Sequence, residues 1–442
     1  MKSRFLMLIA AVTLFAALAM PFRLAAQQEQ QQPRIVFHYK LTVLPTLGGT
    51  FGQALGINSK GSVAGYSTLA GDMQADAFIS QKGMLTDLGT LGGPVSLPAP
   101  VGGNGINSRG MVAGFSNTST PDPNGEDVCG VETFLICLPF VWQKGTMSAL
   151  PLLGGNNGQA LGINNRGQIV GGAETPNPDP CSIFFLQVEA VFWENSEVQE
   201  LPPFPGDPDG FANAINDRGE TVGVSGCAAT NIVRAVLWPK GQSGGVIDLG
   251  NLGGAGGNVP SDINNQGQVV GQSDLPGDTT HHAFLWTKED GMRDLGTLNG
   301  QPVSLAFGIN SRSQVVGIFE DFAGDNTTGV LWQGGVMTDL NTLTPPESPL
   351  FLQEPVDIND SGEIVGFGLL SDGEQRGFLL TPCDEKHPDV DGCDYSLVDA
   401  NTLPSAPVAV RPTQDEASDR VPSALIWRRS NRFHLSSMKP KN

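Results

Sequence analysis

The sequence predicts an all-β protein, a seven-bladed β-propeller built of four-stranded blades and closed by an N-terminal strand that completes the last blade. Three observations lead to this prediction. A unit of about 50 residues recurs seven times, each copy reads as two β-hairpins without helical periodicity, and the chain carries one spare strand before the first copy.

The first half of each repeat has the pattern I-N-x-x-G-x-x-x-G, which is typical of a β-hairpin. The asparagine can accept a hydrogen bond from the backbone two residues on, and the first glycine tolerates a positive φ. The copies begin at Ile57, Ile106, Ile163, Ile215, Ile263, Ile309 and Ile358, and the expected turn residues are Asn58, Asn107, Asn164, Asn216, Asn264, Asn310 and Asn359. Only the sixth copy lacks the first glycine, because Ser313 stands there, so we expect that turn to be strained or differently shaped.

The second half reads as another hairpin, for example His282–Trp286 followed by Met292–Gly300. One repeat position holds a tryptophan in five copies, at Trp142, Trp193, Trp238, Trp286 and Trp332. Stacked repeats bury equivalent positions, so we expect these rings to pack between neighbouring blades rather than to bind a ligand. A recurring aspartate, at Asp87, Asp248, Asp294 and Asp339, is expected to make a repeated structural hydrogen bond rather than to bind cations.

The two ends of the repeat region predict how the ring closes. A strand like Val43–Gly49 (VLPTLGG) follows each of the first six copies, but none follows the seventh, which ends at Gly377–Pro382. A ring needs such an arrangement, because the N-terminal strand then completes the last blade and no sheet edge stays open. The predicted propeller spans residues 35–382, with blades of the size found in kelch propellers.

The segments HAFLW, GINNRGQIVG and DLGTLGG resemble those of the extracellular HAF repeat family, named after the tripeptide found here at His282–Phe284. The resemblance covers about residues 39 to 382. It implies an exported repeat protein and carries over no catalytic residue.

The regions outside the repeats point to export. Residues 1–26 combine Lys2 and Arg4, an apolar run and a small-residue site before Gln27, so we expect a cleaved signal peptide. Residues 27–34 read as a polar linker, and residues 383–442 as a cysteine-containing, proline-rich, largely irregular tail. With no apolar run of membrane length in this tail, we expect no stable membrane anchor after cleavage. The expected location is secreted or on the exterior of the cell envelope, the periplasm included.

Composition narrows the classes of partner. The formal net charge of −20 makes nucleic acid and anionic lipid poor partners. Six cysteines in an exported chain are expected to form disulfides. Because equivalent loops of adjacent blades lie side by side, the predicted pairs are Cys129 with Cys137, Cys181 with Cys227, and Cys383 with Cys393.

The sequence contains no recognisable catalytic, cofactor or metal motif: there is no G-x-S-x-G, no H-E-x-x-H and no phosphate-binding loop. His281 and His282 are adjacent, and neighbouring strand residues point to opposite faces. We therefore expect a solvent-exposed loop pair rather than a metal site.

Loop lengths give the one clue to where a partner would bind. The loops between the two hairpins are longest in the second and third copies, Gly114–Pro139 and Gly171–Ala190, and the connections Leu88–Ile106 and Leu340–Ile358 between copies are also stretched. Such loops emerge on one face, so the first hypothesis is a monomeric, non-catalytic binding or scaffold module for an extracellular protein, glycan or envelope component. The alternative is a hydrolase or lyase that uses loop carboxylates, drawn from Asp122, Glu126, Asp127, Glu174, Asp179, Glu347 and Glu354. Neutral insertion of loop residues also remains open.

Overall fold

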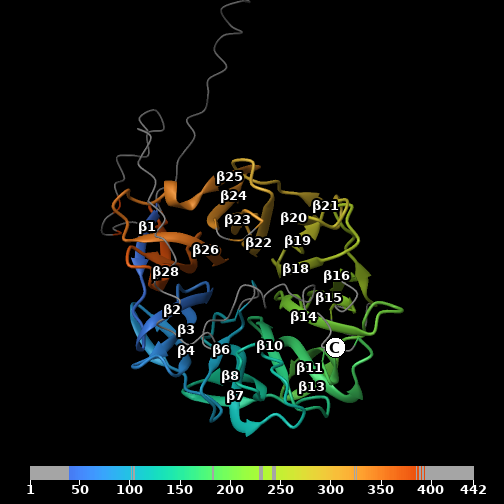
Figure 1. Cartoon of the computed structure of the whole chain (residues 1–442). Helices are drawn as coiled ribbons and strands as arrows, with labels where there is room; N and C mark the ends of the chain where they lie inside the picture. Colours follow the sequence, from blue (N-terminus) through green and yellow to red (C-terminus); the bar gives the residue numbers. More distant parts are fainter. Residues whose placement is uncertain are drawn as a thin grey trace, which may run out of the picture. The chain divides into compact units, whose positions relative to one another are not determined.

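The computed structural model contains seven four-stranded antiparallel sheets arranged in a ring, which confirms the seven-bladed propeller (Figure 1). It describes residues 39–100, 102, 105–181, 184–227, 232–240, 245–322, 324, 326–384, 386, 387, 390 and 393. The predicted signal peptide and linker, and the tail beyond residue 393, lie outside this range. Among the described residues, none form a helix with the length and hydrophobicity that a membrane crossing requires.

Each blade is named here by its order along the chain, and its strands are given from the axis outward. Blade 1 has β2 (Gly48–Ile57), β3 (Val63–Leu69), β4 (Ala75–Gln81) and β5 (Met84–Asp87); blade 2 has β6 (Ser96–Pro98), β7 (Val112–Pro121), β8 (Leu135–Gln143) and β9 (Thr146–Ala149); blade 3 has β10 (Gly158–Ile163), β11 (Ile169–Pro178), β12 (Leu186–Glu194) and β13 (Glu197–Glu200); blade 4 has β14 (Asp209–Ile215), β15 (Thr221–Cys227), β16 (Ile232–Trp238) and β17 (Ile247–Asp248).

The second half of the ring follows the same plan. Blade 5 has β18 (Asn258–Ile263), β19 (Val269–Asp274), β20 (His281–Thr287) and β21 (Gly291–Asp294); blade 6 has β22 (Val303–Ile309), β23 (Val315–Glu320), β24 (Thr328–Gln333) and β25 (Val336–Asp339), followed by the 3-10 turn η3 (Leu340–Thr342); blade 7 has β26 (Leu350–Ile358), β27 (Ile364–Leu370), β28 (Gln375–Pro382) and β1 (Tyr39–Val43).

The N-terminal strand closes the ring as predicted. Strand β1 pairs antiparallel with β28, in a register that runs from Tyr39 opposite Pro382 to Val43 opposite Phe378. In Figure 1 the blue N-terminal strand therefore lies beside the last, red-orange strand of the chain. Pairing the two ends of the repeat region leaves the outer edge of blade 7 protected like the others.

The repeated asparagines shape the turns and also join the blades. Each side-chain Oδ1 accepts the backbone N–H two residues on, at 2.9–3.0 Å. Each side-chain Nδ2 donates to the backbone carbonyl of the asparagine in the next blade, at 2.9–3.1 Å, and Asn359 completes the circle by donating to Asn58. Each asparagine side chain thus accepts a backbone N–H of its own turn and donates to the turn of the next blade.

The second glycine of the motif is required by a close approach of two strands. The first strand of six blades has a register shift, as between Ala306 and Gly308 in blade 6. A Cβ on Gly317 would overlap the carbonyl oxygen of Leu305, and the corresponding glycine of every other blade meets its first strand in the same way. No side chain fits there without displacing backbone.

The turn at Ser313 keeps the shape of the others and is strained. Its φ is +57°, and its N–H donates to the carbonyl of Asn310 at 3.1 Å, as the glycine N–H does in the other copies. The expectation of a strained turn is therefore met, and the turn is not differently shaped.

The tryptophans lie between blades. Four of the five are buried and Trp142 is half-buried. The indole N–H of Trp193 donates to the carbonyl of Pro151, and that of Trp238 to the carbonyl of Pro202, in the connections that lead into their blades. Their contacts are those of packing residues.

One expectation about loop length was wrong. The extra residues of Leu88–Ile106 do not lengthen the connection between blades, which ends at Val95; they interrupt the first strand of blade 2 after Pro98. Gly102 in this insertion lies against the carbonyl of Phe307, in blade 6. The insertion therefore reaches across the inside of the ring, where Ala99, Gly102 and Gly105 are buried.

Candidate functional site

The connections of the propeller emerge on two faces that differ in charge. The loop face carries the connections between second and third strands and those between blades; the turn face carries the two hairpin turns of each blade. In the described part of the chain, the loop-face connections hold twelve acidic residues and no lysine or arginine: Asp72, Asp122, Glu126, Asp127, Glu132, Asp179, Asp207, Asp278, Asp321, Glu347, Asp372 and Glu374.

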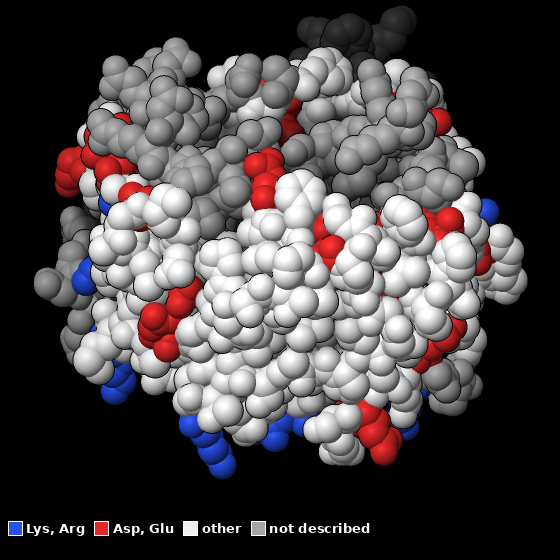
Figure 2. All heavy atoms as spheres, turned by 60° about the horizontal axis from the view of Figure 1, so that its bottom comes forward, with Lys and Arg blue, Asp and Glu red and all other residues white. Residues whose placement is uncertain are grey.

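The turn face collects most of the basic residues. Its described turns hold six acidic residues and nine basic ones, Lys60, Lys82, Arg109, Lys144, Arg166, Arg218, Lys240, Lys288 and Arg312. In Figure 2 the basic side chains in view gather mostly along the lower rim, with acidic side chains above them. Negative charge therefore gathers on the loop face and positive charge on the turn face, although Asp207 and Glu374 are paired with Arg234 and Arg376 of the adjoining strands. The excess of carboxylates on the loop face attracts cations.

Large apolar side chains are also exposed on the loop face. Met73, Phe134, Phe185 and Phe322 are 71%, 52%, 65% and 74% exposed, and each lies between the second and third strands of its blade. Phe134 also has a φ of +54°, which is unusual for a bulky residue and holds its ring at the end of the blade 2 insertion.

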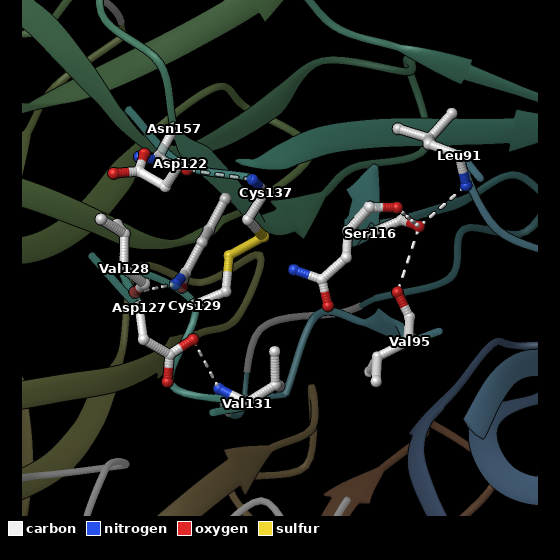
Figure 3. Close-up of a disulfide and its surroundings, with 12 residues drawn as sticks. Leu91, Val95, Ser116, Asp122, Asp127, Val128, Cys129, Val131, Cys137 and Asn157 are labelled. Atoms are coloured by element: carbon white, nitrogen blue, oxygen red, sulfur yellow. Dashed lines mark hydrogen bonds between the residues drawn. A yellow bond between two sulfur atoms is a disulfide. The ribbon is translucent and has the colours of Figure 1, made fainter. Parts of the chain in front are cut away.

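The insertion of blade 2, residues 122–134, is held by a disulfide and by two aspartates, Asp122 and Asp127 (Figure 3). Cys129 and Cys137 are bonded, with their Cα atoms 6.2 Å apart. The carboxylate of Asp127 accepts the N–H of Val131 at 3.2 Å and that of Glu132 at 2.6 Å. These contacts order a loop that would otherwise lose entropy on binding.

Asp122 and Glu174, proposed above as acids of a hydrolase, have structural partners instead. The side-chain Nδ2 of Asn157 donates to Asp122 at 2.9 Å and to Glu174 at 3.2 Å. Glu174 also accepts the N–H groups of Asn156 and Asn157, and it is fully buried. Burial raises the pKa of Glu174 in spite of these hydrogen bonds. The group is enclosed, so a substrate does not reach it.

Of the other proposed acids, Glu126 lies near this pair: after burial, repulsion from Glu174 and Asp122 adds to the rise in its pKa. Glu126 accepts the N–H of Phe185, in the neighbouring insertion of blade 3. Glu354 is buried in the first strand of blade 7, whereas Glu347 is exposed in the connection before it. The seven residues do not form one catalytic group.

The two remaining disulfides have the partners that the loop positions predict. Cys181 in blade 3 is bonded to Cys227 in blade 4, with a Cα–Cα distance of 5.6 Å. Cys383 is bonded to Cys393 just after β28. Three disulfides indicate an oxidising environment, and the first of these two joins neighbouring blades on the loop face.

A group of carboxylates that sequence spacing does not reveal lies beside the Cys181–Cys227 bond. Burial, followed by repulsion from Glu200 and Asp209, raises the pKa of Glu189 to about 8. Burial, followed by repulsion from Asp179, raises the pKa of Asp209 to about 7. These residues come from β12, β13, β14 and the loop after β11, so only the folded ring brings them together.

The recurring aspartates make the repeated hydrogen bond that the sequence predicts. Asp87, Asp248, Asp294 and Asp339 each accept the backbone N–H two residues on, at 2.6–2.8 Å. They shape the turn that leads to the next blade.

The expectation for His281 and His282 was wrong in part, since both lie in β20 and both are half-buried. His282 Nδ1 lies 2.9 Å from an Asp294 carboxylate oxygen, whereas His281 Nδ1 lies 4.0 Å from Asp274. Burial lowers the pKa of His281. Their partners lie on different neighbouring strands, as alternation along a strand requires.

A cavity of about 110 Å³ lies on the axis, lined by the Ile-Asn pairs of all seven repeats, the residue after each pair, and Asp357. Pockets for small-molecule ligands usually measure about 300–1,000 Å³. This cavity is too small for a substrate of that kind.

No protein-family model and no curated protein sequence matches the chain. Among solved structures, it is similar to Pyrococcus horikoshii acylaminoacyl peptidase (13% identity, TM-score 0.41, 72% of this chain and 50% of that one) and to a puromycin-hydrolyzing peptidase of Mycobacterium tuberculosis (13%, 0.41, 77% and 51%). It is also similar to a gluconolactonase of Xanthomonas campestris (6%, 0.34, 78% and 90%). The chain spans about half the length of the two peptidases, and likeness at this level does not extend to activity.

Proposed function

We propose that the protein is an exported, non-catalytic binding module that holds a positively charged protein partner on its loop face. The observation that carries this proposal is the composition of that face, with twelve carboxylates, no cation and four exposed Met or Phe side chains in its described connections. Complementary charge speeds encounter and selects the partner, while aromatic and methionine side chains supply most of the binding energy at protein interfaces.

Export is supported by three disulfides, which suit an oxidising compartment, and by the charged and apolar order of residues 1–26. Resemblance of the repeats to the extracellular HAF family is in keeping with this. Binding is favoured over hydrolysis because two of the candidate acids, Asp122 and Glu174, are buried and hydrogen-bonded to Asn157.

The proposal can be tested with a small, strongly basic protein as probe. We expect the purified protein to bind this probe with an affinity that falls steeply as salt is added. Binding should be lost once the probe's lysines are acetylated, because acetylation removes their positive charge. The double variant Phe134→Ser with Phe185→Ser should bind the probe at least about tenfold more weakly, because the complex loses two aromatic side chains that the probe would cover.

The matched control is Met84→Ser with Val336→Ser, which alters side chains exposed at the turn-face ends of β5 and β25. This variant should bind like the parent. A glycan array and a panel of chromogenic hydrolase substrates are run beside it. Equal loss in both double variants, binding to glycans alone, or turnover of any substrate would contradict the proposal.

A further inference from the structure

The loop face combines two features that anything bound to it must match. Its described connections carry twelve carboxylates and no lysine or arginine. The same connections expose four large apolar side chains by 52–74%, namely Met73, Phe134, Phe185 and Phe322. Exposed apolar side chains gathered on one surface mark an interaction site, and the surrounding charge selects a partner of opposite charge. A segment that covers this face must therefore be both basic and apolar.

Two of the exposed rings lie on neighbouring insertions that are already ordered. Glu126, in the insertion of blade 2, accepts the backbone N–H of Phe185, in the insertion of blade 3. Phe134 ends the insertion of blade 2, and each insertion contains a disulfide-bonded cysteine, Cys129 and Cys181 respectively. A segment can cover these rings with little further loss of loop entropy.

The described chain ends on the opposite face. Strand β28 runs towards the turn face and ends there at Pro382, beside the turn residue Gly362. The Cys383–Cys393 disulfide keeps the following residues near this end. Because the turn face holds most of the basic residues, a basic segment farther along the chain is attracted more strongly to the loop face.

The sequence contains such a segment beyond the described range. Residues 420–442 hold six basic residues and no acidic one: Arg420, Arg428, Arg429, Arg432, Lys439 and Lys441. The same stretch holds large apolar residues, which include Leu425, Ile426, Trp427, Phe433 and Leu435. Its composition therefore complements both the charge and the exposed rings of the loop face.

The connecting chain is long enough for this segment to reach the loop face. There are 26 residues between Cys393 and Arg420, and a chain of that length spans up to about 90 Å when extended. Strand β2, which runs between the two faces, has 10 residues and is about 33 Å long. The connection can therefore pass from one face of the propeller to the other within a single chain.

We propose that residues 420–442 bind to the loop face of their own chain and compete there with the basic protein partner. This inference rests on the proposed function, since the same carboxylates and exposed rings serve both. A tethered segment acts at an effective concentration on the order of 1 mM, so one with a dissociation constant of about 0.1 mM covers the face about nine-tenths of the time. The apparent dissociation constant for the partner then rises about tenfold.

The first test measures binding of the small basic probe protein to the full chain. The triple variant Arg428→Gln, Arg429→Gln and Arg432→Gln should bind the probe about tenfold more tightly than the parent, because its segment no longer competes. These substitutions lie outside the propeller, and thermal unfolding of the variant should match that of the parent.

The matched control is the triple variant Lys82→Gln, Lys144→Gln and Lys288→Gln. It removes the same amount of positive charge from exposed lysines of the turn face, and it should bind the probe like the parent. An equal gain of affinity in both triple variants would reflect net charge alone and would overturn the inference. Equal binding by the parent and the Arg428, Arg429 and Arg432 variant would also overturn it, and the proposed function would stand.

The second test locates the segment without the probe. A carbodiimide joins lysines to carboxylates in contact with them, so we expect cross-links from Lys439 or Lys441 to loop-face acids such as Glu132, identified by mass spectrometry. A mixture of isotope-labelled and unlabelled protein shows whether each cross-link lies within one chain. Cross-links to turn-face acids alone, or only between chains, would overturn the inference. Loop-face cross-links without any probe binding would contradict the proposed function alone.

Discussion

The side-chain amide of Asn359, in the last blade, donates a 3.1 Å hydrogen bond to the backbone carbonyl of Asn58, in the first. The two residues are 301 positions apart, and the bond completes a circle of seven equivalent ones. The circle ties each of these turns to the turn of the next blade, and in several blades a second hydrogen bond between turns, such as that from the N–H of Ser311 to Asp360, adds to it.

Replacing Asn359 should therefore lower the free energy of unfolding by more than replacing an ordinary turn residue does. Asn359→Ala leaves two turn N–H groups without their acceptor and removes one of the two hydrogen bonds that the carbonyl of Asn58 accepts, so we expect the free energy of unfolding in urea to fall by about 2–4 kcal/mol. Asn359→Asp keeps the acceptor but loses the donor, and it should also destabilise. Asn251→Ala, which removes one exposed bond to Gly253, should cost less than about 1 kcal/mol. Equal losses of unfolding free energy at Asn359 and Asn251 would show that the circle of hydrogen bonds does not add to stability.

Closure by β1 predicts that a chain beginning at Leu44 unfolds more readily than one beginning at Tyr39. The shorter chain exposes the edge of β28, and every bond between Tyr39–Val43 and its partners is lost. Urea unfolding should show a lower midpoint for the shorter chain. If both chains have the same midpoint, the strand does not stabilise the ring.

The two special positions of the sixth repeat should respond in opposite directions. Gly317→Ala forces a Cβ against the carbonyl of Leu305 and should destabilise by about 3 kcal/mol or more. Ser313→Gly relieves a φ of +57°, and after the entropic cost of glycine it should be neutral or stabilise by up to about 1 kcal/mol. Thermal unfolding of the two variants checks the contrast, and a destabilised Ser313→Gly would count against strain in this turn.

The disulfides should differ in their contribution to stability according to the loops that they close. Separations of 46 and 8 residues give about 4 kcal/mol for Cys181–Cys227 and about 2.5 kcal/mol for Cys129–Cys137 in the chain-entropy model. Double alanine variants of each pair, compared in urea, should keep that order. The reverse order would mean that native-state contacts dominate over the restriction of the unfolded chain.

Asp76 predicts an unusual pH dependence of stability. Burial, followed by repulsion from Asp87, raises the pKa of Asp76 to about 7. Since the folded chain holds this proton more tightly than the unfolded chain, its contribution is complete below about pH 4 and is lost as pH rises to about 7. Asp76→Asn should match the parent at pH 4 and exceed it at pH 8, on the order of 2 kcal/mol.

The pH dependence assigned to Asp76 needs a carboxylate exposed to solvent as its control. Glu289→Gln, an exposed substitution, serves as the control and should follow the parent at both pH values. A parent whose free energy of unfolding rises between pH 5 and 8 would contradict the raised pKa values of Asp76, Asp209, Glu189 and Asp357, which all act in the same direction.

Sequence patterns predict the number of blades, the hairpins, the closing strand and the cysteine pairs, and the structure agrees with each. These depend on local turn chemistry and on order along the chain: the repeated asparagine, in six copies with a glycine three residues later, favours a tight turn, and adjacent repeats become adjacent blades. The folded ring decides that Asn359 meets Asn58, that Gly102 reaches Phe307, and that Asp179 and Asp209 come together beside the Cys181–Cys227 disulfide. Such contacts depend on the register between blades and on closure of the ring, and spacing along one chain carries no signal for either.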